Sequence, residues 1–170
     1  MAADKLFYYS KSRDLPAGYG ANEVVADKKK YRELNEIDNW RKILSNFHVS
    51  KFKYGDYYYN TIEHCYHAQK FNLVSKVTAF KLTLDSDHPF GKGDGLSARK
   101  NRKLIVLSEK ELLEWEKIKY ETTKAICQAK YNQVAIYKKV INLTCDAELW
   151  HIVMRSTPIR TAYLEEIRNT

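Results

Sequence analysis

The segment from Asn60 to Phe71 holds the side chains with the clearest potential for chemistry. Its sequence, NTIEHCYHAQKF, places Glu63 and Lys70 seven residues apart, with His67 between them. On an α-helix these side chains share one face, with Glu63 and Lys70 about 10 Å apart along the axis. A carboxylate can move protons or stabilise positive charge, and a lysine amine can form a covalent intermediate. The segment therefore favours a helix that packs on a core and presents an acid, an imidazole and an amine to a cleft.

Two other interpretations of this segment stay open on the residues alone. Glu and Lys at helical spacing commonly belong to a solvent-exposed helix face. His64, Cys65 and His67 are also metal-ligand types, but adjacent residues on a helix point in different directions. No H-E-x-x-H or C-x-x-C motif accompanies them. We therefore expect no metal and no cofactor.

Positive charge is concentrated in one part of the chain. The 170 residues include 29 Lys plus Arg against 21 Asp plus Glu, a net charge of +8. Residues 91–103 hold five cations against one carboxylate, Asp94, and so supply half of that surplus: Lys92, Arg99, Lys100, Arg102 and Lys103. Such a segment favours a polyanionic partner, although many basic segments form only a solvated surface. The preceding glycine loop, GKGDG at 91–95, leads into a helix start that could offer backbone amides to a diphosphate.

The composition excludes several classes of protein. Hydrophobic residues make up 44% and aromatic residues 13% of the chain, which a disordered protein would lack. No run of about 18 apolar residues is present, so we expect no membrane association. The three cysteines are widely spaced, which favours a reducing compartment over a disulfide framework. The first residues lack the apolar segment of a secretory signal. We expect a cytoplasmic or other intracellular protein, with a nuclear location also open.

Hydrophobic periodicity and turn residues predict a single α+β domain over residues 1–170, mostly helical with a few short strands. The capping box of Ser108 and Glu111 predicts the start of a long helix with Leu112, Trp115, Ile118, Ile126 and Ala129 on its buried side. Residues 27–42 are expected to be partly helical, and residues 85–95 to form a loop. The other expected elements are a strand at 6–9, a hairpin turning at Gly55, a helix from Ile62 to beyond Phe71, a helix at 134–143, a strand at 148–153 and a final helix from Pro158 to about Arg168.

Several of these motifs together resemble the NADAR (YbiA-like) family. LSNF at 44–47 and TIEHCYHAQKF at 61–71 match that family's L-S-N-F and T-x-E-H-x-x-x-A-x-K-F patterns. The resemblance continues through ARKNRK at 98–103, through Trp115, and through LTCDAELWH at 143–151. The opening FYYSKSRDLPAGYGANE is similar to an N-terminal extension found in some members. On this resemblance, residues 1–43 hold the extension and the start of the fold, and residues 44–170 hold the core motifs.

The resemblance implies a hydrolase that cleaves an N-glycosidic bond at a ribose carrying a nucleotide-like group. The leading expectation is removal of ADP-ribose from ADP-ribosylated guanine in DNA or RNA. One alternative is an N-glycosidase acting on phosphorylated intermediates of riboflavin biosynthesis, and another is a non-catalytic module that binds ADP-ribose or nucleic acid. The expected partner is thus ADP-ribose-modified nucleic acid or a small molecule similar to ADP-ribose. The oligomeric state is not indicated.

The resemblance also implies roles for individual residues. Lys70 would be the nucleophile that forms a Schiff base with the sugar, and Glu63 would be the general acid and base. The expected substrate-binding residues are Asn46, Phe47, His67, Arg99, Lys100, Arg102, Trp115 and His151. Phe47 and Trp115 could stack on a base or line the pocket, but aromatic residues at such spacing more often pack in the core. For Asn46, a turn or cap is as plausible as a hydrogen bond to the substrate. The D-x-x-W-G motif of many bacterial members is replaced here by HIVMRSTPIR at 151–160, which leaves the substrate and catalytic competence open.

Overall fold

The computed structural model describes all residues from Met1 to Thr170. The chain forms two compact units. The first unit comprises Met1–Ser45 and Ala135–Thr170, and the second comprises Asn46–Val134. Helices and strands both occur, with eight α-helices and five short strands, so the predicted α+β class is confirmed.

The first unit contains a three-stranded mixed sheet of order β1-β4-β5. Strand β1 (Lys5–Tyr8) lies parallel to β4 (Glu148–His151), with Leu6 opposite Leu149. Strand β5 (Ile159–Arg160) runs antiparallel to β4 and forms the other edge. Leu6, Tyr8 and Leu149 are buried, so the sheet carries part of the core of this unit.

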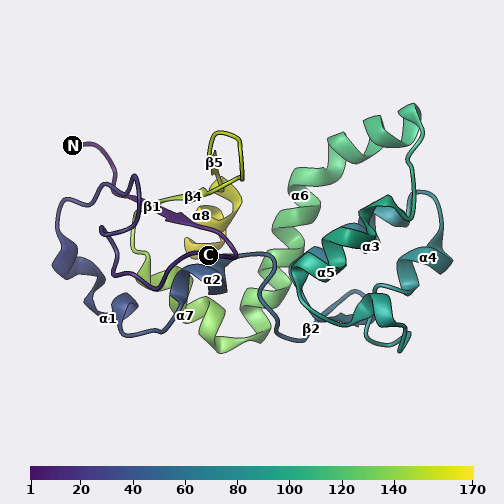
Figure 1. Ribbon diagram of the computed structural model, residues 1–170, viewed down its shortest axis with the longest axis horizontal. Helices are drawn as coiled ribbons and strands as arrows, with labels where there is room; N and C mark the ends of the chain where they lie inside the picture. Colours follow the sequence, from purple (N-terminus) through teal and green to yellow (C-terminus); the bar gives the residue numbers. More distant parts are fainter. The chain divides into compact units, whose positions relative to one another are not determined.

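Five helical segments complete the first unit (Figure 1). Helix α2 packs on β1, helix α8 packs on β4, and helix α7 contacts α1, α2 and α8. Buried side chains of α2, α7 and α8, among them Trp40, Tyr137 and Leu164, fill the space between these elements. The segments are the 3-10 helix η1 (Lys28–Tyr31), α1 (Arg32–Asn35), α2 (Trp40–Leu44), α7 (Ala135–Leu143) and α8 (Ala162–Arg168).

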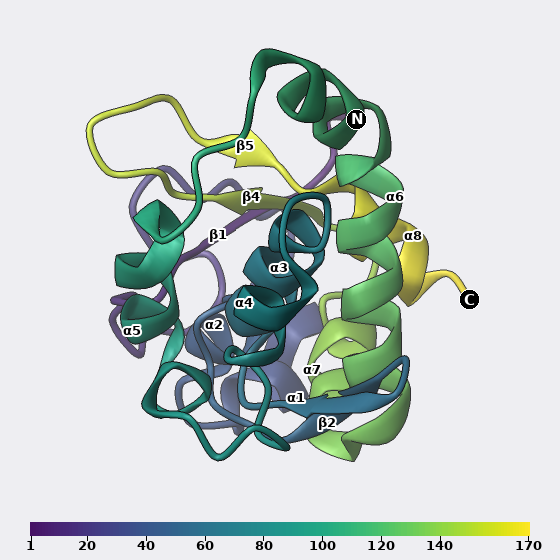
Figure 2. The same cartoon turned by 90° about the vertical axis from the view of Figure 1, so that its right-hand side faces the viewer.

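The second unit is built around helix α3 (Ile62–Phe71), which packs against α4, α5 and α6 (Figure 2). The hairpin predicted around Gly55 is present, and Gly55 adopts a positive φ of 59° in its turn. Helix α6 begins at the predicted capping box, with both Ser108 and Glu111 side chains engaged, and it also packs on β2. The remaining elements are β2 (Phe52–Tyr54), β3 (Tyr57–Tyr59), α4 (Lys76–Phe80), η2 (Pro89–Gly91), α5 (Gly95–Lys100), η3 (Asn101–Lys103) and α6 (Glu109–Gln133).

Three details of the sequence prediction are wrong. Helix α3 ends at Phe71 and does not continue beyond it. The last helix begins at Ala162 rather than at Pro158, because Ile159 and Arg160 are extended and pair with β4. Leu112 and Ile118 are 46% and 44% exposed, because the buried stripe of α6 is narrower than its periodicity predicted.

None of the helices combines the length and the apolar character that crossing a membrane requires.

Candidate active site

Helix α3 is fixed in position at its first turn. The Thr61 side chain accepts a hydrogen bond from the backbone N–H of His64 and caps the helix. The backbone N–H of Glu63 donates to the carbonyl of Asn46 at 3.1 Å, which ties the predicted Asn46 to the start of the helix. Core-facing residues of α3 are fully buried, namely Ile62, Cys65, Ala68 and Phe71. The helix therefore has little freedom to rotate, and the direction of Glu63 and Lys70 is set by this packing.

Glu63 and His67 form a hydrogen-bonded pair on α3. The His67 Nε2 lies 2.9 Å from the Glu63 Oε1, and the two side chains are 6% and 14% exposed. His67 Nδ1 is buried and has no hydrogen-bond partner. A proton on Nδ1 would be a buried, unsatisfied donor, so we assign the neutral tautomer with its proton on Nε2. In this tautomer His67 donates to a Glu63 carboxylate, and the second carboxylate oxygen of Glu63 accepts no hydrogen bond from the protein.

Lys70 lies two helical turns after Glu63 and is half-buried in the last turn of α3. Its ammonium forms neither a hydrogen bond nor an ion pair with the protein. The helix geometry places it on nearly the same face as Glu63, as the sequence predicted. An amine without a protein partner on a face shared with a carboxylate is available to a substrate.

His67 is less accessible than the sequence predicted. Its side chain is only 6% exposed, forms a hydrogen bond with Glu63 and contacts the rings of Tyr66 and Phe71, so it does not face an open cleft. Tyr66 in turn lies edge-on to Trp115 of α6, with ring centroids 5.2 Å apart. Burial raises the pKa of Tyr66, which keeps its hydroxyl protonated. Trp115 is itself buried, so the structure places it beneath Tyr66 as a packing residue next to the Glu63 face.

His64 joins α3 to the glycine loop. The Thr61 hydroxyl lies 2.7 Å from His64 Nδ1, and His64 Nε2 lies 3.2 Å from the Lys92 carbonyl. The Thr61 oxygen accepts a hydrogen bond from the His64 amide, so the Thr61 hydroxyl proton is free to be donated to His64 Nδ1. His64 Nε2–H then donates to the Lys92 carbonyl. Burial lowers the pKa of His64, in agreement with this neutral tautomer. His64 is thus a structural clamp.

Phe47 lies directly against the start of α5. Its carbonyl accepts a hydrogen bond from the Gly95 amide at 3.1 Å, and a Cβ added to Gly95 would lie 2.3 Å from the Phe47 Cα. Phe47 is half-buried, and its backbone contact explains why a glycine stands at position 95. The LSNF segment therefore positions α5 as well as α3.

Arg99 and Lys100 of α5 and Arg102 of η3 are exposed. None of the three forms an ion pair, so their charges are available to an anionic partner. The start of α5 itself differs from the expected diphosphate site. The Asp94 carboxylate accepts from the Ser97 amide at 3.0 Å and caps the helix, which places a negative charge where a phosphate would bind. An anion at this segment would therefore bind the side chains and not the helix start.

The last predicted residue, His151, belongs to the first unit. It ends β4, is half-buried, and its ring lies 5.5 Å from that of Tyr8. Arg155 and Arg160, in the segment that follows His151, differ in their interactions. Arg155 has a positive φ of 60°, and Arg160 forms a hydrogen-bonded ion pair with Glu165 at 2.8 Å, so Arg160 serves the packing of α8.

The second unit contains a buried lysine that was not expected from the sequence. Lys130 of α6 is 0% exposed, and its Nζ donates to the His48 carbonyl at 2.7 Å. Burial lowers its pKa from 10.5 to about 7. The signal was present, because Thr123, Ile126, Cys127, Lys130 and Tyr131 have the spacing of one buried helix face.

The fold has a counterpart among solved structures. The NMR structure of the E. coli protein YbiA matches with a TM-score of 0.58, covering 99% of this chain and 85% of YbiA, at 16% sequence identity. The chain has the YbiA fold. This agrees with the fold that the NADAR resemblance implies, and at this identity the likeness concerns the fold alone. No known protein-family profile matches the sequence, and no curated protein matches it significantly.

Proposed function

We propose that the protein is an N-glycosidic hydrolase that removes ADP-ribose from ADP-ribosylated guanine in nucleic acid. The observation that carries this proposal is the arrangement on α3. One oxygen of the Glu63 side chain bonds His67 at 2.9 Å and the other is free, and the unpaired amine of Lys70 follows two turns later. The YbiA fold and the motif resemblance support the same class of activity.

The proposed reaction needs only these two groups and water. The Lys70 amine attacks the anomeric carbon as the bond to the guanine nitrogen breaks, and the base leaves with the bonding electrons and takes a proton. Glu63 accepts the proton that the attacking amine loses and returns it to the leaving base. The bond between the anomeric carbon and the ring oxygen then breaks, and the opened sugar forms a Schiff base with Lys70. Addition of water to the imine releases the sugar and regenerates Lys70, so the net change is hydrolysis.

Glu63 suits the charge that develops on the sugar. Loss of a base from ribose builds oxocarbenium character on the ring, as in other glycoside hydrolyses. A carboxylate that is mostly buried stabilises such a charge more strongly than one in water, because solvent screens it less. The hydrogen bond from His67 orients this carboxylate.

The exposed basic residues favour a nucleic-acid substrate over a small metabolite. Arg99, Lys100 and Arg102 have no acidic partners and lie together on α5 and η3. Side chains of this kind bind backbone phosphates and contribute affinity that does not depend on sequence. We therefore propose that they contact the nucleic acid that flanks the modified base.

The test is an activity assay on the full chain with an ADP-ribosylated guanine oligonucleotide, measured by release of ADP-ribose. We expect release by the wild-type protein, and its loss in Lys70→Ala and in Glu63→Gln. Lys117→Ala, a substitution of an exposed lysine on α6, is the matched control and should retain activity. Normal turnover by Lys70→Ala would refute the mechanism.

A second substrate and a binding measurement, run beside this assay, distinguish the alternatives. Turnover of a phosphorylated riboflavin-pathway intermediate without release of ADP-ribose would favour the metabolite N-glycosidase. Tight binding of ADP-ribose with no turnover of either substrate would favour a non-catalytic module.

A further inference from the structure

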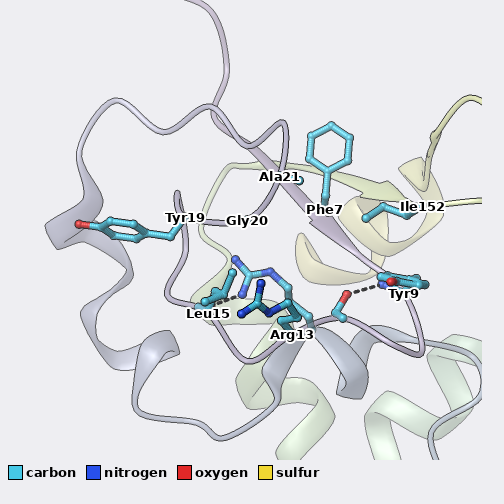
Figure 3. Close-up of a pocket in the computed structure, with 10 residues that line it drawn as sticks. Phe7, Tyr9, Arg13, Leu15, Tyr19, Gly20, Ala21 and Ile152 are labelled. Carbon is cyan, nitrogen blue, oxygen red and sulfur yellow. Dashed lines mark hydrogen bonds between the residues drawn. The ribbon is translucent and has the colours of Figure 1, made fainter.

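The first unit contains a cleft of about 420 Å³ formed within its own residues. Residues of β1, the loop that follows it and the segment after β4 line this cleft, among them Phe7, Tyr9, Arg13, Tyr19, Gly20 and Ile152 (Figure 3). We call it the loop cleft. Its volume lies in the range of small-molecule pockets, which are roughly 300–1,000 Å³. Glu63 and Lys70 belong to the other unit, so the loop cleft is defined without them.

The wall of the loop cleft is held by a buried ion pair. Arg41 and Glu23 bond at 2.9 Å with side chains that are 4% and 0% exposed. The Glu23 carboxylate also accepts the backbone amides of Phe7, Gly18 and Gly20 at 2.7–3.1 Å. Arg41 in turn donates to the carbonyls of Leu15 and Pro16.

This network fixes the loop before any ligand arrives. Loops of this length without secondary structure are costly to order, and here both backbone donors and backbone acceptors are satisfied by buried charged groups. A preformed cleft loses less entropy on binding than a mobile loop. The two charges of the pair neutralise each other, so the net charge of the cleft comes from elsewhere.

Arg13 supplies that charge. It is exposed and lines the cleft, and it forms no ion pair with the protein. Arginine binds phosphate and carboxylate groups through a planar pair of donors. The free charge of the cleft is therefore positive, and its ligand is expected to be an anion.

The remaining lining is rich in aromatic rings. In Figure 3 Phe7, Tyr9 and Ile152 lie on one side of the cleft, Tyr19 lies on the other, and Arg13 lies between them. The Tyr19 ring is 60% exposed, and the Lys28 ammonium lies 3.7 Å from its centroid. Aromatic side chains open to a cleft favour contact with a flat ring of a ligand.

We propose that the loop cleft binds a nucleoside monophosphate, with its base against the aromatic side chains and its phosphate on Arg13. This site lies beyond the proposed hydrolase reaction and does not depend on it. Binding of such a ligand would give a role to two features of this unit: the unpaired Arg13 in the cleft and the long loop that a buried ion pair holds in place.

Calorimetric titration of the full chain with AMP tests the proposal. We expect saturable binding, weakened at least tenfold by Arg13→Gln and about fivefold by Tyr19→Ala. Both side chains are exposed, so these variants should fold normally. Lys11→Gln removes an exposed cation from the same loop that does not line the cleft, and it should change the affinity less than twofold. Adenosine and ribose 5-phosphate should each bind more weakly than AMP.

Three results would overturn the proposal. The first is no binding of AMP at millimolar concentration. The second is equal weakening by Arg13→Gln and Lys11→Gln, which would indicate diffuse charge attraction. The third is loss of AMP binding in Lys70→Ala with normal binding in Arg13→Gln, which would place the nucleotide at α3. Since the oligonucleotide assay reports on Glu63 and Lys70 and the titration reports on Arg13 and Tyr19, failure of one proposal can be distinguished from failure of the other.

Discussion

Replacement of the buried lysine Lys130 by methionine should change how the stability of the protein depends on pH. The pKa of Lys130 is lowered by burial from 10.5 to about 7, so between these values the unfolded chain binds a proton that the folded chain does not. Stability therefore rises with pH across this window. Methionine has a volume similar to that of lysine and no charge, so Lys130→Met removes the pH dependence of stability that Lys130 contributes.

The magnitude follows from the same values. Each pH unit within the window is worth about 1.36 kcal/mol. Between pH 7 and pH 9, allowing for partial protonation of the folded state at pH 7, the wild-type protein should gain about 2 kcal/mol relative to Lys130→Met. The range avoids the ordinary titration of histidine, and it also stays below the pKa of Cys127, which burial raises to about 12.

The assay is urea unfolding of both proteins at pH 7, 8 and 9, followed by circular dichroism. The quantity that matters is the change with pH of the difference between the two free energies of unfolding. The loss of the hydrogen bond to the His48 carbonyl adds a constant to that difference and does not alter its slope. A difference that stays constant from pH 7 to pH 9 would refute the account of Lys130.

Three further substitutions test the second unit. Gly95→Ala should lower the free energy of unfolding by about 1–3 kcal/mol, since the new Cβ would lie 2.3 Å from the Phe47 Cα; unchanged urea unfolding would contradict this contact. Trp115→Ala should cost about 3–5 kcal/mol through loss of its buried packing against Tyr66, and a cost below 1 kcal/mol would argue against that packing. His67→Leu should lower kcat on the order of tenfold with little change in KM, because Glu63 loses the donor that orients it, while His67→Gln, which retains an N–H donor, should keep more of the rate. A larger effect on KM than on kcat in His67→Leu would instead indicate direct contact with substrate.

Local signals in the sequence predicted the elements of the fold well where capping and turn residues were distinctive. Ser108 and Glu111 predicted the start of α6, and Gly55 marked the hairpin turn. Errors arose where tertiary contacts decided the outcome. Ile159 and Arg160 are extended because β4 offers them a partner, although Pro158 is equally compatible with a helix start.

The candidate site was predicted in part. The spacing of Glu63 and Lys70 was enough to place both on one helix face. It could not show that His67 is buried and donates to Glu63, because that depends on the neighbouring Tyr66 and Trp115. Nor could spacing show that Asp94 caps α5 and so occupies the helix start expected to bind phosphate.

Reductive trapping tests the central claim most directly. The protein is incubated with an ADP-ribosylated guanine oligonucleotide in the presence of borohydride, and the product is analysed by peptide mass spectrometry. The proposed Schiff base predicts a stable adduct of the sugar on Lys70, absent from Lys70→Ala and still formed on Lys70 in Lys117→Ala. Release of ADP-ribose by the wild-type protein with no adduct on Lys70, or with an adduct on another lysine, would contradict the assignment of Lys70 as the nucleophile.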